Sequence, residues 1–306
     1  MQLRAHVEQL SLTPAEDAVA RSILYAALFD YPLTLAELRR TLIRSKQTAS
    51  EILATIRNSP SLGEIVEFKD GYFYPAGCAH LVETRRHRAT RSQAFLAVHR
   101  PILSFLAACP YVRMVALSGS VAHMNLESGG DLDLFIVTRG PRVWLVAVTV
   151  VLLAKLLGRR RTLCANYIVA DTDLTFSPAD LFTASQVIGL VPLTGAATFQ
   201  HLLDANPFVG DCYPNFHAAD RVSARLRRPG FTERIKPVFE WLLWLPSALA
   251  ERVCRRAYRT YLRSRAARWA SPEQVRLDDA VLKLHTRSHR SEIISRFEAT
   301  VRNSLP

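Results

Sequence analysis

VRMVALSGSVAHMNLESGGDLDLFIVT, at residues 112–138, is the stretch that decides the expected fold of this chain. Its first part, VRMVAL, is apolar and predicts a buried strand. The Ser-Gly-Ser that follows predicts a turn, and the last part, DLDLFIVT, predicts a second strand. The stretch therefore predicts a strand, a small-residue turn and a second strand that opens with two carboxylates.

The two carboxylates, Asp131 and Asp133, carry the chemistry expected of this stretch. Side chains two residues apart on a strand point to the same face, so the acids converge while Leu132 and Leu134 enter the core. Converging carboxylates repel each other unless a divalent cation lies between them, and Mg²⁺ is usually held by one or two carboxylates together with substrate phosphates. We therefore expect Asp131 and Asp133 to be catalytic metal ligands, with Mg²⁺ or Mn²⁺ as the ion.

The turn before the carboxylates is suited to phosphate. Small residues let the backbone come close to phosphate oxygens, and backbone N–H groups and serine hydroxyls can donate hydrogen bonds to them. We therefore expect Ser118, Gly119 and Ser120 to bind nucleotide. Together with the two acids, they predict a site for a metal-bound nucleoside triphosphate.

This arrangement of a strand, Gly-Ser, ten further residues and Asp-Leu-Asp before another strand resembles the nucleotidyltransferase superfamily related to DNA polymerase β. Gly119, Ser120, Asp131 and Asp133 match its motif position for position. The resemblance implies an α+β fold in which a central mixed sheet is packed with helices. It also implies an enzyme that transfers a nucleoside monophosphate from the triphosphate to an acceptor hydroxyl or phosphate and releases pyrophosphate. It does not name the acceptor or the preferred base.

Most of the chain also looks like a bacterial and archaeal family of nucleotidyltransferase-domain proteins with an N-terminal winged-helix-like region. The matching pieces are an Asp-Gly hairpin, an arginine-rich segment and several short motifs, at residues 70–74, 85–91, 163–167, 206–208, 214–216, 282–285 and 290. This second resemblance implies a fold and a reaction type, and only its Gly-Ser and Asp-Leu-Asp part has a mechanistic meaning.

The third carboxylate usual in that superfamily has no obvious counterpart here. The polar position of the next apolar stretch, residues 162–170, is Asn166, and Asp171 and Asp173 follow the stretch. Three interpretations are open: Asn166 ligates metal or substrate, Asp171 or Asp173 supplies the acid, or the chain binds nucleotide with slow or no chemistry. An amide that hydrogen-bonds the backbone is the structural alternative for Asn166.

Residues 1–82 are expected to form a winged-helix-like domain. Helices are predicted from Thr13 to about Phe29, from Leu35 to Ile43 after Thr34, and from Thr48 or Ser50 to about Ser59. An Asp-Gly turn between residues 64–68 and 72–74 then predicts a hairpin. The functional interpretation is DNA contact by the third helix. That helix carries one arginine and one glutamate, so a dimerisation or packing module is the alternative.

Residues 83–215 are expected to form the nucleotidyltransferase domain. They begin with a predicted helix at 83–107, whose start is rich in arginine. We expect Arg85 and Arg88 to bind nucleotide phosphates, because guanidinium groups suit phosphate and the segment precedes the site closely in sequence. A solvated helix start is the alternative.

Residues 216–306 are expected to form a helical region packed on the transferase domain. Residues 233–249 are aromatic and apolar, and residues 251–269 carry seven arginines. Apolar positions at helical spacing are Val253, Ala257, Tyr258, Tyr261 and Leu262, and the opposite face is Arg252, Arg255, Arg256, Arg259 and Arg263. Such a helix can lie on anionic lipid or nucleic acid, or can pack its apolar stripe on the neighbouring domain.

The charge and hydrophobicity of the chain limit the kinds of binding partner that are expected. The chain has 39 basic and 27 acidic residues, a net charge of +12, which favours nucleotide, nucleic acid or an anionic lipid surface. The apolar residues 143–157 are too few to span a bilayer and predict a buried helix, so we expect no transmembrane span. The beginning of the chain lacks an apolar leader, and the five cysteines are dispersed, so a cytoplasmic protein with reduced thiols is expected.

Two further functions compete with the enzyme. One is a catalytically weak or degenerate nucleotide-binding regulator whose winged helix binds DNA or protein, an interpretation favoured by the missing third acid. The other is peripheral membrane association through residues 233–269, with a lipid-linked or surface acceptor.

Overall fold

The computed structural model describes residues 12–160, 162–221, 230–284 and 289–305. The chain divides into two compact units. The N-terminal unit comprises the chain up to His87, the segment Gly210–Phe216 and the last segment, which begins at Arg290; the sheet unit comprises Arg88–Val209 and His217–His289. These units differ from the expected boundaries at 82 and 215, because Gly210–Phe216 and the last helix belong with the N-terminal unit.

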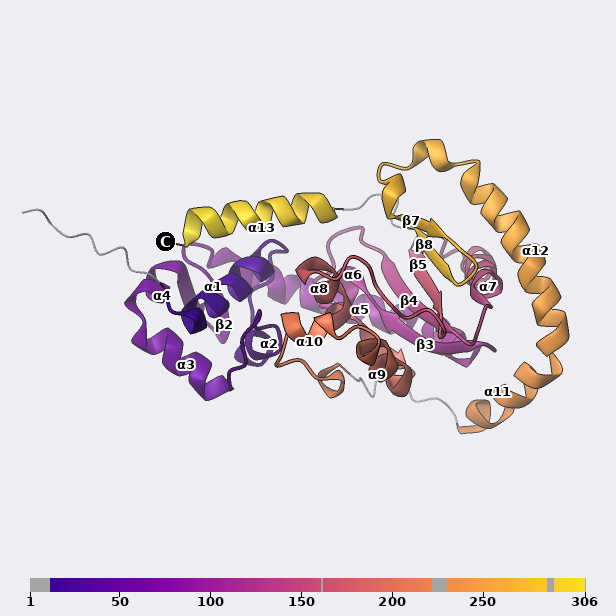
Figure 1. Ribbon diagram of the computed structural model, residues 1–306, viewed down its shortest axis with the longest axis horizontal. Helices are drawn as coiled ribbons and strands as arrows, with labels where there is room; N and C mark the ends of the chain where they lie inside the picture. Colours follow the sequence, from indigo (N-terminus) through magenta and orange to yellow (C-terminus); the bar gives the residue numbers. More distant parts are fainter. Residues whose placement is uncertain (1–11, 161, 222–229, 285–288, 306) are drawn as a thin grey trace, which may run out of the picture. The chain divides into compact units, whose positions relative to one another are not determined.

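The N-terminal unit contains the three predicted helices and the predicted hairpin. They are α1 (Pro14–Ala27), α2 (Leu35–Arg40), α3 (Ala49–Asn58), β1 (Val66–Lys69) and β2 (Tyr72–Pro75) (Figure 1). Each helix begins with a capping box, in which a threonine and a glutamate three residues later bond each other's backbone N–H: Thr13 with Glu16, Thr34 with Glu37, and Thr48 with Glu51. Helix α2 ends before the predicted Ile43.

Three additional helical segments complete this unit. Ser59 caps the short α4 (Pro60–Ile65), which the sequence did not predict. Helix α10 (Phe208–Cys212) lies at the start of the returning segment, and α13 (Arg290–Ser304) packs on α1, where Phe297 meets Tyr25 edge to face. The apolar core of the unit is formed by α1 to α4 and the hairpin, with Val19, Leu38, Ile52 and Phe73 at most 2% exposed.

The sheet unit is built on a mixed sheet of six strands, which confirms the α+β class. The strands are β3 (Val112–Leu117), β4 (Leu132–Thr138), β5 (Leu163–Ala170), β6 (Val191–Thr194), β7 (Val275–Leu277) and β8 (Val281–Leu284), in the order β6-β3-β4-β5-β8-β7. Strands β4 and β5 are parallel, and the other neighbours are antiparallel. Strands β3 and β4 are the two that the opening stretch predicts.

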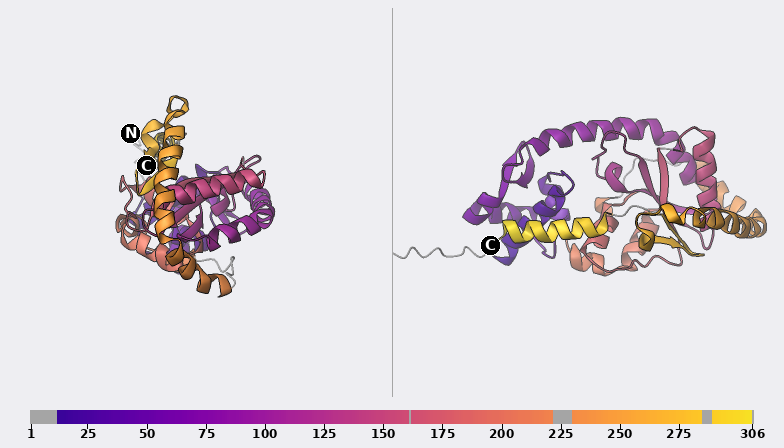
Figure 2. Two further views of the ribbon diagram at one scale, coloured as in Figure 1. Left: turned by 90° about the vertical axis from the view of Figure 1, so that its right-hand side faces the viewer. Right: turned by 90° about the horizontal axis from the view of Figure 1, so that it is seen from above.

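Helices surround this sheet. They are the second part of α5 (His80–Ala108), α6 (Gly119–Ala122), α7 (Val143–Leu156), α8 (Leu181–Gly189), α9 (Ala196–Asp204), α11 (Gly230–Leu242) and α12 (Trp244–Arg263), with short 3₁₀ turns at Ala218–Asp220, Ala266–Arg268 and Pro272–Gln274. Helix α7 packs on β5 and β8, and α12 packs on α7 along the outside of the unit (Figures 1 and 2).

The predicted buried helix at 143–157 is buried on one side only. Trp144 and Val150 lie in the core with Leu132, Leu134 and Ile136 of β4. On the other side, Leu152 and Leu156 are exposed at 59% and 84%. No helix in the described ranges is long and apolar enough to cross a membrane.

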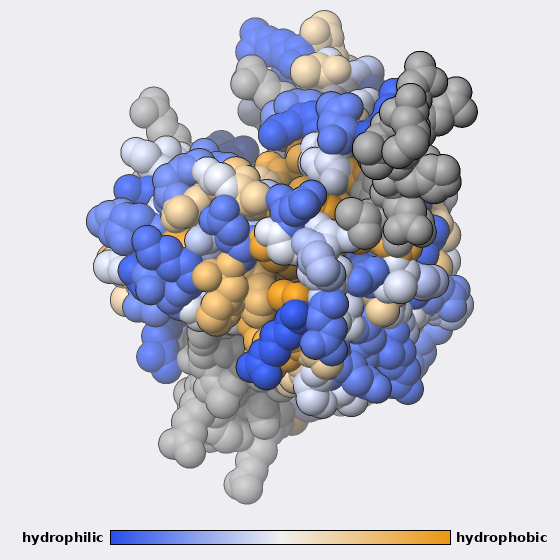
Figure 3. All heavy atoms as spheres, turned by 90° about the vertical axis from the view of Figure 1, so that its left-hand side faces the viewer, coloured by the Kyte–Doolittle hydropathy of each residue, from blue (hydrophilic) through white to orange (hydrophobic). Residues whose placement is uncertain are grey.

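The surface of the molecule carries both hydrophilic and apolar residues. Figure 3 shows one face, on which hydrophilic residues predominate and apolar residues gather near the middle. Some apolar exposure is usual on the surface of a folded protein.

Candidate functional site

The Gly-Ser turn and the carboxylates lie at one end of the sheet. Strands β3 and β4 are antiparallel, and Leu117 at the end of β3 is opposite Leu134 near the start of β4. The Ser118 N–H donates to the Asp133 carbonyl oxygen at 3.0 Å. Ser118, Gly119 and Ser120 therefore lie beside Asp133, as the opening stretch predicts.

Gly119 is in contact with the Asp133 carboxylate. Its φ is +62°, and a Cβ built on it would lie 2.5 Å from Asp133 Oδ2. A side chain at this position would clash with the carboxylate and would also strain the backbone. Glycine is thus required here for two reasons, and the backbone of the turn approaches the carboxylate directly.

Asn166 reaches the same carboxylate through a bulge in β5. Asp133 is opposite Cys164, and Phe135 is opposite Tyr167, so β5 has one more residue than β4 between these pairs. Asn166 Nδ2 donates to Asp133 Oδ1 at 2.5 Å. Because an ionised carboxylate only accepts hydrogen bonds, the amide nitrogen must face it. Among the described residues, the side chain of Asn166 thus hydrogen-bonds a site carboxylate rather than the backbone.

The site holds more negative charge than its surroundings compensate. Burial raises the pKa of Asp133, repulsion by Asp131 raises it further, and the hydrogen bond from Asn166 opposes both, leaving the pKa at about 7. Within the described residues, neither carboxylate forms an ion pair with a lysine or arginine. A cation held by the two carboxylates would compete with the proton that Asp133 binds near neutral pH.

Cys164 adjoins the carboxylates and is influenced by the charge of Arg160, and neither residue was predicted as a site residue. Burial, a hydrogen bond to Asp131 and the negative charges of Asp131 and Asp133 raise the pKa of Cys164 to about 12, while Arg160 opposes them. The thiol is therefore protonated and is not a nucleophile at neutral pH. Strand register places Cys164 here, which a pattern within one strand cannot show.

Asp171 and Asp173 are at the other end of β5. The Asp171 N–H donates to the carbonyl oxygen of Thr138, the last residue of β4, and its carboxylate accepts from the Gly140 N–H at 2.8 Å. Asp173 lies 3.9 Å from Arg276. Because Cys164 is opposite Asp133, about 20 Å of parallel strand separates these acids from the Asp131 and Asp133 pair. This position argues against the interpretation in which Asp171 or Asp173 supplies a third carboxylate.

The described residues contain no cluster of three or more His, Cys, Asp or Glu side chains that could hold a metal ion. The two aspartates and the Asn166 oxygen are the groups at this site that a cation could use, so its remaining ligands would have to come from substrate and water.

Arg88 is attached to the connection between the turn and the carboxylates. Its guanidinium lies 2.9 Å from Glu127 Oε1 and 3.5 Å from Asn125 Oδ1. The Asn125 N–H in turn donates to the Ser120 carbonyl oxygen at 2.9 Å. Arg91 donates to the Leu126 carbonyl oxygen in the same connection. The structure thus brings Arg88 to the neighbourhood of Ser120.

Arg85 has a different place, and its expected role needs correction. It is 9% exposed within the N-terminal unit, where it pairs with Glu37 at 2.7 Å and lies over the rings of Tyr31 and Tyr72. Burial alone would raise the pKa of Glu37, but the hydrogen bond and charge of Arg85 lower it to about 2. The guanidinium is used to hold α2 and the hairpin to α5, so we no longer assign it to nucleotide binding.

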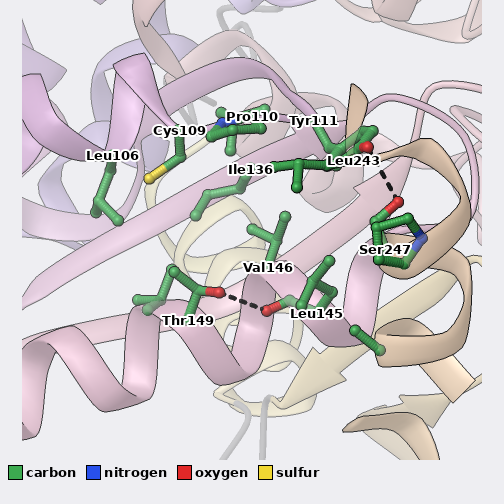
Figure 4. A pocket seen from close by; sticks show the side chains of 14 residues that line it. Leu106, Cys109, Pro110, Tyr111, Ile136, Leu145, Val146, Thr149, Leu243 and Ser247 are labelled. Carbon is green, nitrogen blue, oxygen red and sulfur yellow. Dashed lines mark hydrogen bonds between the residues drawn. The ribbon is translucent and has the colours of Figure 1, made fainter. Parts of the chain in front are cut away.

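An apolar pocket of about 310 Å³ lies elsewhere in the sheet unit (Figure 4). Its walls include Val112, Ile136, Val146 and Leu243. Asp133 and Ile136 are three residues apart on β4, so their side chains point to opposite faces of the sheet. The pocket is therefore separate from the carboxylates.

Comparison with known proteins adds no relative: no protein-family model matches the chain, and neither does a curated protein or a solved structure.

Proposed function

We propose that the sheet unit is a nucleotidyltransferase that uses Asp131 and Asp133 to hold a divalent cation on a nucleoside triphosphate. The observation that carries the proposal is the contact of the Gly119 backbone with the Asp133 carboxylate, beside Asp131. It joins a group suited to phosphate and a group suited to a cation within one site. The resemblance of Gly119, Ser120, Asp131 and Asp133 to the superfamily motif supports the same function.

The residues present fit Mg²⁺ or Mn²⁺. Both aspartates are oxygen ligands of the kind that these hard cations prefer. The pKa of Asp133 is raised first by burial and then by repulsion from Asp131, and a bound cation would relieve that repulsion. When bound, the cation would neutralise triphosphate charge and polarise the α-phosphoryl group. Asn166 would fix the orientation of Asp133 through its amide hydrogen bond.

The turn would hold the substrate for in-line transfer. The backbone N–H groups of Gly119 and Ser120 and the serine hydroxyls would donate to the β- and γ-phosphates, and Arg88 would add positive charge beside Ser120. The acceptor oxygen would then form a bond to the α-phosphorus while the bond to the bridging oxygen breaks and pyrophosphate leaves. Positioning and charge stabilisation supply most of the catalysis in such reactions.

Asn166 restricts the choice of acceptor. An amide cannot take a proton from an attacking hydroxyl, and the acids beyond β5 are too distant to do so. The proton of a hydroxyl acceptor would pass to water, which makes the reaction slow. An acceptor oxygen that is already ionised at neutral pH, such as a phosphate, avoids this step. We therefore favour a phosphate acceptor.

The test uses α-³²P-labelled nucleoside triphosphates, Mg²⁺ or Mn²⁺, and a cell extract as the acceptor pool. We expect the wild type to transfer label and the double variant Asp131→Asn, Asp133→Asn to transfer none. Asp173→Asn is the matched control, since it removes one carboxylate at the other end of β5. Full transfer by the double variant would refute the proposal, and so would equal loss in the control.

A nucleotide-binding regulator is the second candidate, and the Asn166 hydrogen bond to Asp133 favours it. It predicts cation-dependent binding of triphosphate by calorimetry without label transfer. Asn166→Asp separates the two candidates, because it supplies a third carboxylate to the same site. Transfer that appears only in Asn166→Asp would identify the natural chain as a binding protein. Transfer by the wild type would identify it as the enzyme.

A further inference from the structure

The segment formed by α11 and α12 has its polar groups inside and its apolar groups outside. Glu240 is 2% exposed; it accepts from the Tyr111 N–H at 2.8 Å and pairs with Arg139 at 2.7 Å. Lys236, also buried, donates to the Ala107 and Val112 carbonyl oxygens. These contacts fix which side of α11 faces the sheet unit.

Helix α12 is anchored in the same way. Its buried Glu251 accepts from the N–H groups of Trp144 and Leu145, the start of α7. Ser247, also buried, donates to the Tyr111 hydroxyl at 3.0 Å, a bond drawn in Figure 4, and accepts from Arg142. The inward side of both helices is thus held by specific hydrogen bonds, and its orientation does not depend on apolar packing alone.

The outward side carries large apolar side chains, which we call the apolar ridge. Its members are Val238, Phe239, Trp241, Leu242, Trp244, Leu245, Leu249 and Val253, each between 49% and 79% exposed. The predicted inward stripe of α12 is therefore only partly correct: Leu262 is buried, whereas Val253 is 60% and Tyr261 48% exposed. Contiguous apolar exposure on this scale marks a surface that another apolar phase covers.

The charges around the ridge have one sign. The acids between residues 235 and 270 are Glu240 and Glu251, and both are buried. The outward arginines Arg252, Arg256 and Arg263, which we call the arginine row, form no ion pair with any residue in the described ranges. Arg255 and Arg259, by contrast, meet Asp279. Between residues 235 and 270, the outer side of the segment is therefore apolar and cationic, and it carries no acid.

We propose that the apolar ridge and the arginine row dock the protein on the surface of an anionic lipid bilayer. Tryptophan and leucine would enter the headgroup boundary, and the arginines would lie against lipid phosphates. Two exposed tryptophans in the ridge agree with this, since the indole ring favours that boundary. A second copy of the chain fits less well, because a two-fold interface places the same patch against itself and would oppose the two arginine rows. This docking does not depend on the proposed transferase activity.

The experiment is co-sedimentation of the full chain with phosphatidylcholine vesicles that contain or lack phosphatidylglycerol. We expect binding at low salt only to the anionic vesicles. Trp241→Ser with Leu245→Ser should abolish it. Replacing the arginine row with glutamine should lower the partition coefficient roughly a hundredfold.

Matched controls keep the comparison specific. Val98→Ser with Phe105→Ser removes two exposed apolar side chains of α5, at 59% and 54% exposure. Arg57→Gln, Lys69→Gln and Arg100→Gln remove the same charge from other exposed positions. Both controls should bind as the wild type does.

A measurement on the wild type alone guards against misfolded variants. Brominated anionic lipid should quench the tryptophan fluorescence of the bound protein, because Trp241 and Trp244 lie in the ridge. Absence of vesicle binding at low salt, or equal binding to neutral vesicles, would overturn the proposal. So would light scattering that shows a dimer which Trp241→Ser with Leu245→Ser converts to a monomer, because the ridge would then be a subunit interface.

Discussion

The carboxylate site and the α11–α12 segment depart from ordinary solvation in opposite ways. At the start of β4, two acids are brought together, and Asp133 is partly buried without a basic partner. On α11 and α12, apolar side chains are exposed while the acids Glu240 and Glu251 are buried and bonded. Within the described residues, the two carboxylates of the first region have no basic partner, and the apolar side chains of the second region have no cover. Each anomaly is the observation behind one of our two proposals, a divalent cation at the carboxylates and an anionic bilayer at the helices.

The largest effect on the carboxylate site is expected from Gly119→Ala. The new Cβ would meet Asp133 Oδ2 at 2.5 Å and would occupy a backbone with φ of +62°. We expect the carboxylate to be displaced and label transfer, with cation-dependent nucleotide binding, to fall roughly a hundredfold to a thousandfold. Labelled-nucleotide transfer and calorimetry measure the two effects.

Gly129→Ala is the matched control for Gly119→Ala. Its φ is +79°, but a Cβ there meets no atom within 4 Å. It therefore imposes the backbone strain without the clash. If both variants lose activity equally, the contact with Asp133 has no special role.

Glu240→Leu tests the α11–α12 segment. The substitution leaves the buried Tyr111 N–H without its acceptor and the half-exposed Arg139 without its ion pair, so we expect a loss of about 1–3 kcal/mol in unfolding free energy. Vesicle binding should fall as well, because the bond that orients α11 is gone. Urea unfolding measures the first effect and co-sedimentation the second. A variant of unchanged stability would show that the inward polar contacts do not hold the segment.

The unfolding free energy of the chain should depend on pH through the carboxylate site. The pKa of Asp133 is about 7 in the folded chain, whereas an unfolded aspartate has a pKa near 3.9, so the folded state binds more protons between these values. Without cation, stability therefore decreases as pH rises from about 4 to 7 and is flat above. Asp133→Asn should remove this slope and gain roughly 2–4 kcal/mol at pH 8.

Urea unfolding across this pH range, with and without Mn²⁺, measures the Asp133 contribution. The cation should stabilise the wild type at pH 8 and leave Asp133→Asn unchanged. An identical slope in the two proteins would locate the pH dependence at another group.

Local sequence patterns predicted the positions of helices and strands better than they predicted the contacts between residues far apart in the sequence. The strands expected at 112–117 and 131–138 and the caps at Thr13, Thr34 and Thr48 follow from residues next to one another, and the structure confirms them, with the second strand at Leu132–Thr138. The contact of Asn166 with Asp133 depends on a bulge between strands far apart in sequence. No spacing rule within one strand can locate such a bulge.

Helical periodicity has a related limit in α12. It identifies the faces of a helix but not which of them turns inward. The sequence expectation placed Val253 and Tyr261 on the packing stripe, and both are exposed. The inward face is decided by Ser247 and Glu251, whose partners are on α7 and its approach. A polar residue can thus determine which face of a helix is buried when it accepts hydrogen bonds from the free N–H groups at the N-terminus of another helix.

The smallest expected effect separates two arginines three residues apart on α5. Arg85→Gln removes the buried partner of Glu37 and should cost about 2–3 kcal/mol of stability, with nucleotide binding unchanged. It should also make stability less sensitive to acid: the pKa of Glu37, held at about 2 in the wild type, would rise towards its unfolded value, so less stability would be lost as pH falls from about 4 to 2. Arg88→Gln should cost no more than about 1 kcal/mol, since Glu127 is exposed, and should weaken nucleotide binding several-fold. Calorimetry with triphosphate and Mn²⁺, beside urea unfolding, distinguishes the two. If Arg85→Gln weakens nucleotide binding as much as Arg88→Gln does, then the total charge of α5 acts on the nucleotide, and the contacts of each guanidinium do not matter. The proposed role of Arg88 beside Asn125 and Ser120 would then be wrong.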